Sequence, residues 1–170
     1  MPKNKKSTKW MKLDNAALIY PATMNRSWTA LFRLSATLTE PVDEDILEVA
    51  QKRTLRRLPW FAYKLKRGLF WFYLERRDIP AVVKEEAGAP CSGLYIPDKK
   101  TLLFRVSYYK NRINFEVFHA LTDGTGAMHF LMELVKDYLQ EAHPEKELPE
   151  LFPDENITGR DMEEDSFSQY

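Results

Sequence analysis

The chain has 170 residues, of which 44% are hydrophobic and 13% aromatic, which is enough for one ordinary hydrophobic core and too little for two large domains. Its 25 basic and 25 acidic residues balance, so we expect no basic surface that would hold DNA or RNA. The chain has a single cysteine and no apolar run near the roughly 20 residues of a membrane span, a pattern that predicts a cytoplasmic protein without an internal disulfide.

The amino-terminal part is predicted to contain a flexible segment, a strand and a helix. Residues 1–12 are polar and rich in lysine, and no apolar stretch of a secretion signal follows them. Residues 28–38 mix aromatic and β-branched side chains in near alternation, which predicts a strand. Asp43 is a candidate N-cap for a helix over 44–57, with acidic residues in its first turn and basic residues in its last. This helix is expected to stop before Pro59.

The central part is predicted to form two hairpins. Aromatic runs at 60–65 and 69–74 favour the first hairpin, and the Pro- and Gly-containing stretch 78–100 favours a loop with one short strand. Residues 102–109 and 112–118 alternate more clearly and predict the second hairpin. In its last strand, three apolar side chains share one face: Ile113, Phe115 and Val117.

The carboxy-terminal part is predicted to be a helix followed by a tail. Apolar residues recur at helical spacing after a turn at 119–126 and continue to about residue 140. The order of elements predicts an α+β two-layer sandwich, a mostly antiparallel sheet with helices packed on one face. We therefore expect a flexible basic segment over 1–12, one domain over 13–143, and an acidic tail or linker over 144–170.

Candidate chemistry is concentrated in the turn after the last predicted strand. His119 stands where this strand leaves the sheet, and Asp123 follows four residues later. Gly124 and Gly126 are expected to allow a tight loop before the helix begins. If the strand continues, His119 shares a face with Val117, and we expect its ring to face a surface cleft. Histidine is the side chain best suited to exchange a proton near neutral pH.

The segment His119-Ala-Leu-Thr-Asp123-Gly124 resembles the HxxxDG signature of the chloramphenicol-acetyltransferase-like acyltransferases. These include alcohol acetyltransferases, plant acyl-CoA acyltransferases and the condensation domains of peptide synthetases. Further similarity to the alcohol acetyltransferase branch extends over nearly the whole chain: residues 13–21, the strand near Phe32, residues 58–61 and residues 165–167. Members of the family are more than twice as long and have two similar halves facing a channel, so the resemblance implies an amino-terminal half.

The resemblance also implies roles for the residues of the motif. His119 would act as general base, removing the proton of a hydroxyl acceptor that attacks acetyl-CoA or another acyl thioester. Asp123 would support the loop by pairing with an arginine, and Gly124 would let the backbone pack close to the site. Condensation domains commonly carry a second histidine where this chain has Phe118, a departure that favours an acetyltransferase. The residues that bind the thioester remain unknown, and no permanently bound cofactor is implied.

Several alternatives stay open at this point. A lone histidine at a strand end is often structural, and a non-catalytic binding or interaction domain of the same fold is the second hypothesis. A metal site made by His119, Asp123 and His129 is not favoured, because their spacing crosses a loop and lacks the pattern of a zinc helix. As partners we expect a small alcohol or other hydroxylated acceptor and acyl-CoA. A homodimer is expected through the face that the second half of the family's fold covers.

Overall fold

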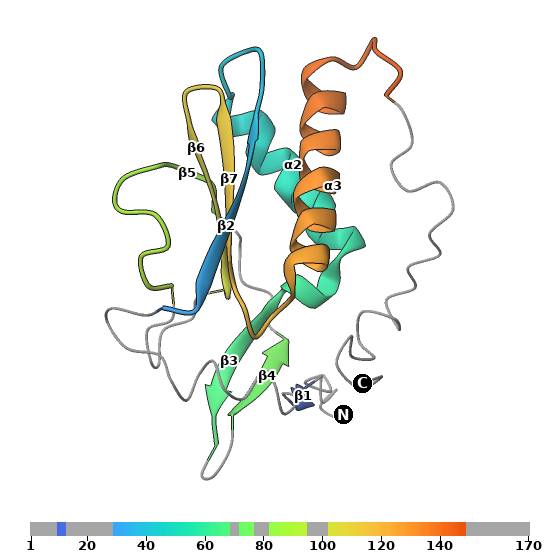
Figure 1. Cartoon of the computed structure of the whole chain (residues 1–170). Helices are drawn as coiled ribbons and strands as arrows, with labels where there is room; N and C mark the ends of the chain where they lie inside the picture. Colours follow the sequence, from blue (N-terminus) through green and yellow to red (C-terminus); the bar gives the residue numbers. More distant parts are fainter. Residues whose placement is uncertain (1–9, 13–28, 69–71, 77–81, 95–101, 149–170) are drawn as a thin grey trace, which may run out of the picture.

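Two long helices cover one face of a four-stranded sheet, and a smaller three-stranded sheet extends beyond one end of this sandwich (Figure 1). The computed structural model describes residues 10–12, 29–68, 72–76, 82–94 and 102–148. This architecture confirms the predicted α+β sandwich with helices on one face.

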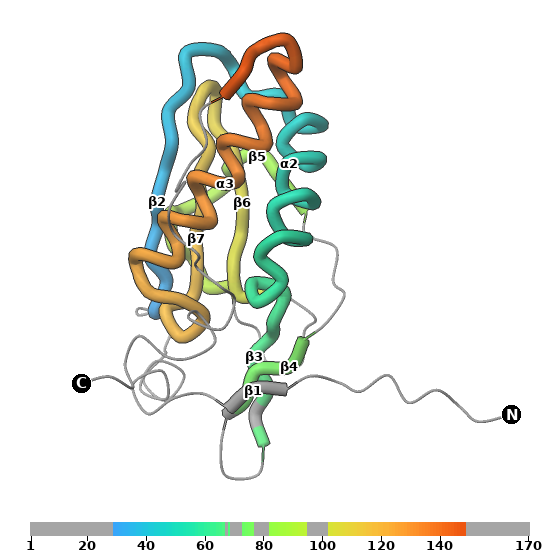
Figure 2. Tube along the Cα trace, turned by 90° about the vertical axis from the view of Figure 1, so that its right-hand side faces the viewer, coloured from blue at the N-terminus to red at the C-terminus, as the bar shows by residue number. Residues whose placement is uncertain are grey.

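The four-stranded sheet has the order β2-β7-β6-β5, with β2 at its edge (Figure 2). Its strands are β2 (Leu31–Thr37), β5 (Lys84–Glu85), β6 (Phe104–Tyr109) and β7 (Arg112–Phe118). β6 and β7 form the second predicted hairpin, and β2 runs antiparallel to β7 over its full length. The short β5 is parallel to β6 and lies in the stretch that the sequence assigns to a loop with one strand.

The helices are α2 (Glu44–Arg57) and α3 (Gly124–Ala142). α2 has the predicted bounds, because the Asp43 carboxylate accepts a hydrogen bond from the Ile46 amide at 3.1 Å and Pro59 follows its end. α3 starts earlier than predicted, since both glycines of the motif lie in its first turn.

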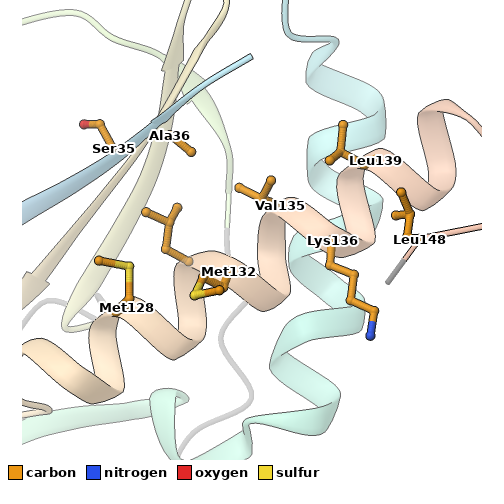
Figure 3. A pocket seen from close by; sticks show the side chains of 9 residues that line it. Ser35, Ala36, Met128, Met132, Val135, Lys136, Leu139 and Leu148 are labelled. Atoms are coloured by element: carbon orange, nitrogen blue, oxygen red, sulfur yellow. The ribbon is translucent and has the colours of Figure 1, made fainter. Parts of the chain in front are cut away.

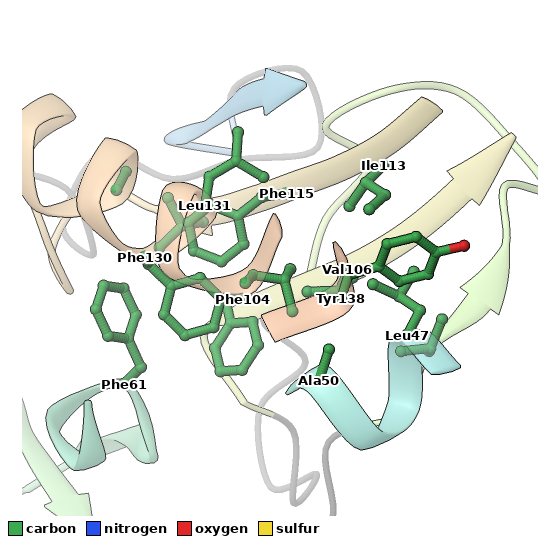
Figure 4. Packing of buried hydrophobic residues seen from close by; sticks show 14 of the residues in the cluster. Leu47, Ala50, Phe61, Phe104, Val106, Ile113, Phe115, Phe130, Leu131 and Tyr138 are labelled. Atoms are coloured by element: carbon green, nitrogen blue, oxygen red, sulfur yellow. The ribbon is translucent and has the colours of Figure 1, made fainter. Parts of the chain in front are cut away.

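Four phenylalanines form the centre of the core between the sheet and the helices (Figure 4). Phe115 of β7 stacks on Phe130 of α3 with ring centroids 4.5 Å apart, and Phe61 and Phe104 close the cluster around them. Buried aromatic contacts of this kind contribute much of the stability of a small core. The core therefore fixes α3 against β7, whose last residue directly precedes His119.

The smaller sheet has the order β1-β4-β3 and consists of β1 (Trp10–Lys12), β3 (Tyr63–Arg67) and β4 (Phe72–Arg76). β3 and β4 form the first predicted hairpin, but the strand expected from residue 60 begins at Tyr63. The reason is a 3₁₀ turn over Pro59–Phe61 that directs Phe61 into the core. β1 lies within the segment 1–12 that was expected to be flexible, and it pairs with β4.

Several predictions concern residues outside the described ranges. These are the stretches similar to alcohol acetyltransferases at 13–21 and 165–167, and most of the acidic tail. Within the described ranges, no helix has the length and hydropathy needed to cross a membrane.

Candidate active site

His119 is the first residue after β7 and lies beside the beginning of β2. Its amide donates a hydrogen bond to the Ala30 carbonyl at 2.9 Å, which extends the pairing of the two strands by one residue. The Leu121 amide donates to the Phe118 carbonyl at 2.8 Å and closes a turn. The backbone of His119 is thus fixed at the end of the sheet, where the chain turns toward α3.

The ring of His119 packs against Phe32 of β2, with ring centroids 4.9 Å apart and planes inclined by 52°. Phe32 pairs with Val117 and belongs to the side of the sheet that faces the helices. His119 stays partly exposed, although its neighbours Phe118 and Ala120 are buried. A partly exposed histidine that packs against an aromatic ring at a strand end is a candidate for accepting a proton from a bound hydroxyl group.

Ala30, which accepts the hydrogen bond of His119, has a left-handed backbone with φ of 52°. This conformation costs a residue with a Cβ atom about 1–2 kcal/mol, so surrounding contacts must hold it. Ala30 is buried, and the hydroxyl of its neighbour Thr29 donates to the Cys91 carbonyl at 2.8 Å. The loop that contains Cys91 therefore anchors the turn on which the position of His119 depends.

Asp123 is the N-cap of α3. Its carboxylate accepts a hydrogen bond from the Gly126 amide at 2.8 Å, and its carbonyl accepts one from the Ala127 amide at 3.0 Å. Among the residues that the structure describes, no arginine forms an ion pair with Asp123. The loop support implied by the resemblance takes the form of a helix cap.

Replacing Asp123 by alanine should lower the free energy of unfolding by about 1 kcal/mol, because the Gly126 amide loses its acceptor. Asp123→Asn is the matched control, since asparagine caps helices about as well as aspartate. Urea denaturation of both variants measures the difference. Equal losses in the two variants would show that the negative charge, rather than the cap, is what matters.

The two glycines of the motif have different surroundings. Gly124 is exposed in the first turn of α3, and a Cβ atom there would meet nothing within 4 Å. The close backbone packing expected at Gly124 is therefore not found among the described residues. Gly126 is buried, and a Cβ atom there would collide with the hydroxyl of Thr122 and lie 3.4 Å from the Asp123 carboxylate. The steric requirement for glycine lies at Gly126, and neither glycine needs a positive φ.

Substitution by alanine should separate the two positions. Gly124→Ala should raise the free energy of unfolding by about 0.5 kcal/mol, because alanine restricts the unfolded chain and fits a helix. Gly126→Ala should lower it by about 1–2 kcal/mol, because Thr122 must move away from the new methyl group. Thermal or urea unfolding of the pair decides; a stabilised Gly126→Ala variant would contradict the assignment.

A buried charge cluster lies on the face of the sheet opposite the helices. Glu116 of β7 has a fully buried side chain, and its carboxylate accepts hydrogen bonds from Arg33 Nε at 2.8 Å, Arg105 Nε at 2.9 Å and the Cys91 amide at 2.7 Å. Arg33 also pairs with Glu86 at 2.5 Å. These contacts connect β2, β7 and β6 with the loop after β5. Glu116, at their centre, is three residues before His119 in the sequence.

The cluster keeps its carboxylates ionised. Burial opposes the charge of Glu116, but the hydrogen bonds from Cys91, Arg105 and Arg33 outweigh burial, so the pKa of Glu116 lies below its ordinary value. The hydrogen bond from Arg33 likewise lowers the pKa of Glu86. Burial and the neighbouring Glu116 raise the pKa of the Cys91 thiol, which does not favour a nucleophilic thiolate there.

Local sequence patterns did not predict this cluster. The alternation in 112–118 placed Glu116 on the face away from the core, which is typical of a solvated residue. Arg33 and Arg105 occupy the matching face of the flanking strands, so charges of opposite sign directly across a three-strand ladder were the available signal.

The described residues also contain an apolar groove, of about 300 Å³, between α3 and β2 (Figure 3). Neither His119 nor Asp123 lines it. No group of three or more His, Cys, Asp or Glu side chains that could hold a metal ion occurs within the ranges that the structure describes.

No family model matches the sequence, and no curated protein matches it. Solved structures with a similar fold include the starter condensation domain of rhizomide synthetase RzmA (12% identity, TM-score 0.62, 84% of this chain and 40% of that chain). They also include the tallysomycin biosynthesis protein TlmII (12%, 0.58, 91% and 43%) and polyketide synthase associated protein 5 from Mycobacterium tuberculosis (16%, 0.57, 82% and 35%).

This chain thus spans about two fifths of the length of each of these structures. The matches cover 82–91% of this chain. The chain therefore has the fold of the amino-terminal half of the chloramphenicol-acetyltransferase-like proteins, to which condensation domains belong.

Proposed function

We propose that this chain is the amino-terminal half of an O-acyltransferase, and more specifically of an alcohol O-acetyltransferase. It would transfer an acyl group from a thioester such as acetyl-CoA to a hydroxyl acceptor. The observation that carries the proposal is the partly exposed His119 at the end of β7, held against Phe32 within an HxxxDG turn of this fold. The proposed setting is the cytoplasm.

In the proposed reaction, the acceptor hydroxyl donates its proton to an imidazole nitrogen of His119 while its oxygen attacks the thioester carbonyl carbon. The tetrahedral intermediate then collapses, and the carbon–sulfur bond breaks. The proton on His119 passes to the leaving sulfur, which gives an ester and a free thiol. The histidine ends neutral and needs no further co-reactant.

The other residues of the motif have supporting roles in this proposal. Asp123 fixes the first turn of α3 through the Gly126 amide and thereby sets the path of the chain that follows His119. Gly124 leaves the solvent side of that turn without a side chain.

The test measures release of free CoA from acetyl-CoA with a thiol reagent, in the presence of a panel of simple alcohols. It uses the longest natural polypeptide that carries these 170 residues, because the channel of such enzymes is formed by two halves. Alcohol-dependent release that is lost in a His119→Gln variant supports the proposal. Release equal to the control without alcohol would overturn it and leave the binding domain as the function of this fold.

A further inference from the structure

We infer that the outer edge of β2, together with the groove beside it, is the interface of a two-fold symmetric dimer of this chain. β2 stands at the edge of the four-stranded sheet (Figure 2). All seven of its residues pair with β7 on one side. On its other side, no strand of the described part of the chain pairs with it.

The backbone of β2 presents regularly spaced hydrogen-bonding groups to this open side. The Ala30 carbonyl and the Leu38 amide both bond toward β7, so the even-numbered residues between them do the same in an antiparallel ladder. The odd-numbered residues, from Leu31 to Thr37, therefore direct their amides and carbonyls outward. The strand contains no proline, its register with β7 has no bulge, and Arg33 is held by Glu116. These are the features of an edge open to pairing.

The side chains next to this edge are incompletely covered. The helix-facing residues of β2 are only partly buried, whereas their partners on β7 are 0% exposed: Phe32, Leu34 and Ala36 against Val117, Phe115 and Ile113. The apolar surface continues from Ala36 into the groove along α3, which Met132 also lines and where Met128 and Val135 point toward β2 (Figure 3). Met128 is 46% exposed. An edge strand and an apolar groove thus form one continuous surface.

A second copy of the chain is complementary to this surface when β2 pairs with itself about an axis at Leu34. Arg33 then lies opposite the partner's Ser35, and Phe32 lies opposite the partner's Ala36. Apolar residues meet apolar residues on the helix side, and no like charges face each other. An axis at Arg33 would instead bring two arginines together. The axis at Leu34 is also the centre of the strand, so all seven residues take part, as an isologous interface requires.

In this dimer the two four-stranded sheets join into one sheet, and the two copies of α3 lie side by side over the apolar ladder. The exposed Met128 of α3 then covers part of the groove of the partner. His119 is level with Ala30, four residues from the axis, so the two histidines are separated by roughly 27 Å along the strand direction alone. The dimer contains two separate His119 sites, and its existence does not depend on the proposed acyltransferase activity.

The first test is sedimentation of the whole chain over a wide concentration range, with Ser35→Pro and Ser35→Ala as a matched pair. The Ser35 amide points to the open side, so proline there removes an intersubunit donor without removing a bond to β7. Both variants lose the hydrogen bond of the Ser35 hydroxyl to Asn114, at 2.9 Å. We expect wild type and Ser35→Ala to dimerise, and Ser35→Pro to dimerise at least about tenfold more weakly.

The second test is covalent and tolerates some loss of stability. In a Cys91→Ala background, Leu34→Cys places two thiols on the axis, with Cα atoms about 4.5 Å apart, within the range of a disulfide. In Ala36→Cys the corresponding atoms are roughly 14 Å apart, so no disulfide dimer is expected. Three results would each overturn the proposal: a monomer at every concentration, equal dimerisation of the two Ser35 variants, or equal cross-linking at residues 34 and 36. A monomer would assign the surface to a different occupant.

Discussion

Replacing His119 by alanine should lower the rate of acyl transfer by about 10²- to 10⁴-fold, the usual contribution of a positioned acid–base group. The expectation applies to the active natural polypeptide and follows from the site of His119 at the open end of β7. His119 is partly exposed, and its backbone amide, which bonds to Ala30, is unaffected by the substitution. Stability should therefore change little, by about 1 kcal/mol or less.

The measurement is steady-state release of free CoA, with thermal unfolding recorded on the same samples. His143→Gln is a suitable control, because this histidine is the C-cap of α3, at the opposite end of the helix from the motif. Turnover of His119→Ala within a few fold of wild type, with the control also active, would remove His119 from the mechanism. A large loss of stability in His119→Ala would instead identify it as a structural residue.

Replacing Glu116 by glutamine should lower the free energy of unfolding by about 3–5 kcal/mol. The carboxylate is fully buried and compensates two guanidinium groups and the Cys91 amide. Glutamine retains one acceptor oxygen but turns an amide donor toward arginine donors. Arg112→Gln serves as the control. Arg112 forms an ion pair with Glu86 at 3.2 Å, but its side chain is 41% exposed, so this pair should contribute less than about 1 kcal/mol to the free energy of unfolding.

The effect of Glu116→Gln should also depend on pH in a defined direction. The pKa of Glu116 is lower in the folded protein than in the unfolded chain, so its ionisation stabilises the fold fully above the unfolded pKa of about 4.3. This contribution is lost as the pH falls through the lower, folded pKa. Urea denaturation near neutral pH and again below pH 4 should show the gap between wild type and variant shrinking in acid; a constant gap would contradict the ionic origin.

Local signals were sufficient for the elements that carry the site. The Asp43 cap, the charges at both helix ends and Pro59 predicted the bounds of α2. The alternation in 112–118 predicted β7 and with it the position of His119 at a strand end. In each case the physical cause lies within a few residues of the element that it determines.

The remaining features depend on contacts between residues far apart in the sequence. Glu116 and Arg33 are 83 residues apart, so no local pattern reveals that they meet in a buried ion pair. Phe61 turns into a 3₁₀ segment because the core between α3 and the sheet accepts its ring, although aromatic content favoured a strand. Gly124 and Gly126 look alike in the motif, and only the position of Thr122 distinguishes them.

The buried charge cluster also constrains how this sequence can change over generations. Glu116 compensates both Arg33 and Arg105, so a substitution at any one of these positions leaves the charges of the cluster incompletely balanced, even though Arg33 also pairs with Glu86. Replacing a whole buried ion triad by apolar side chains of similar volume is often neutral or stabilising, whereas replacing one member is costly. The three positions are therefore expected to evolve as a linked unit. Related sequences should either keep all three charged residues or replace all three together.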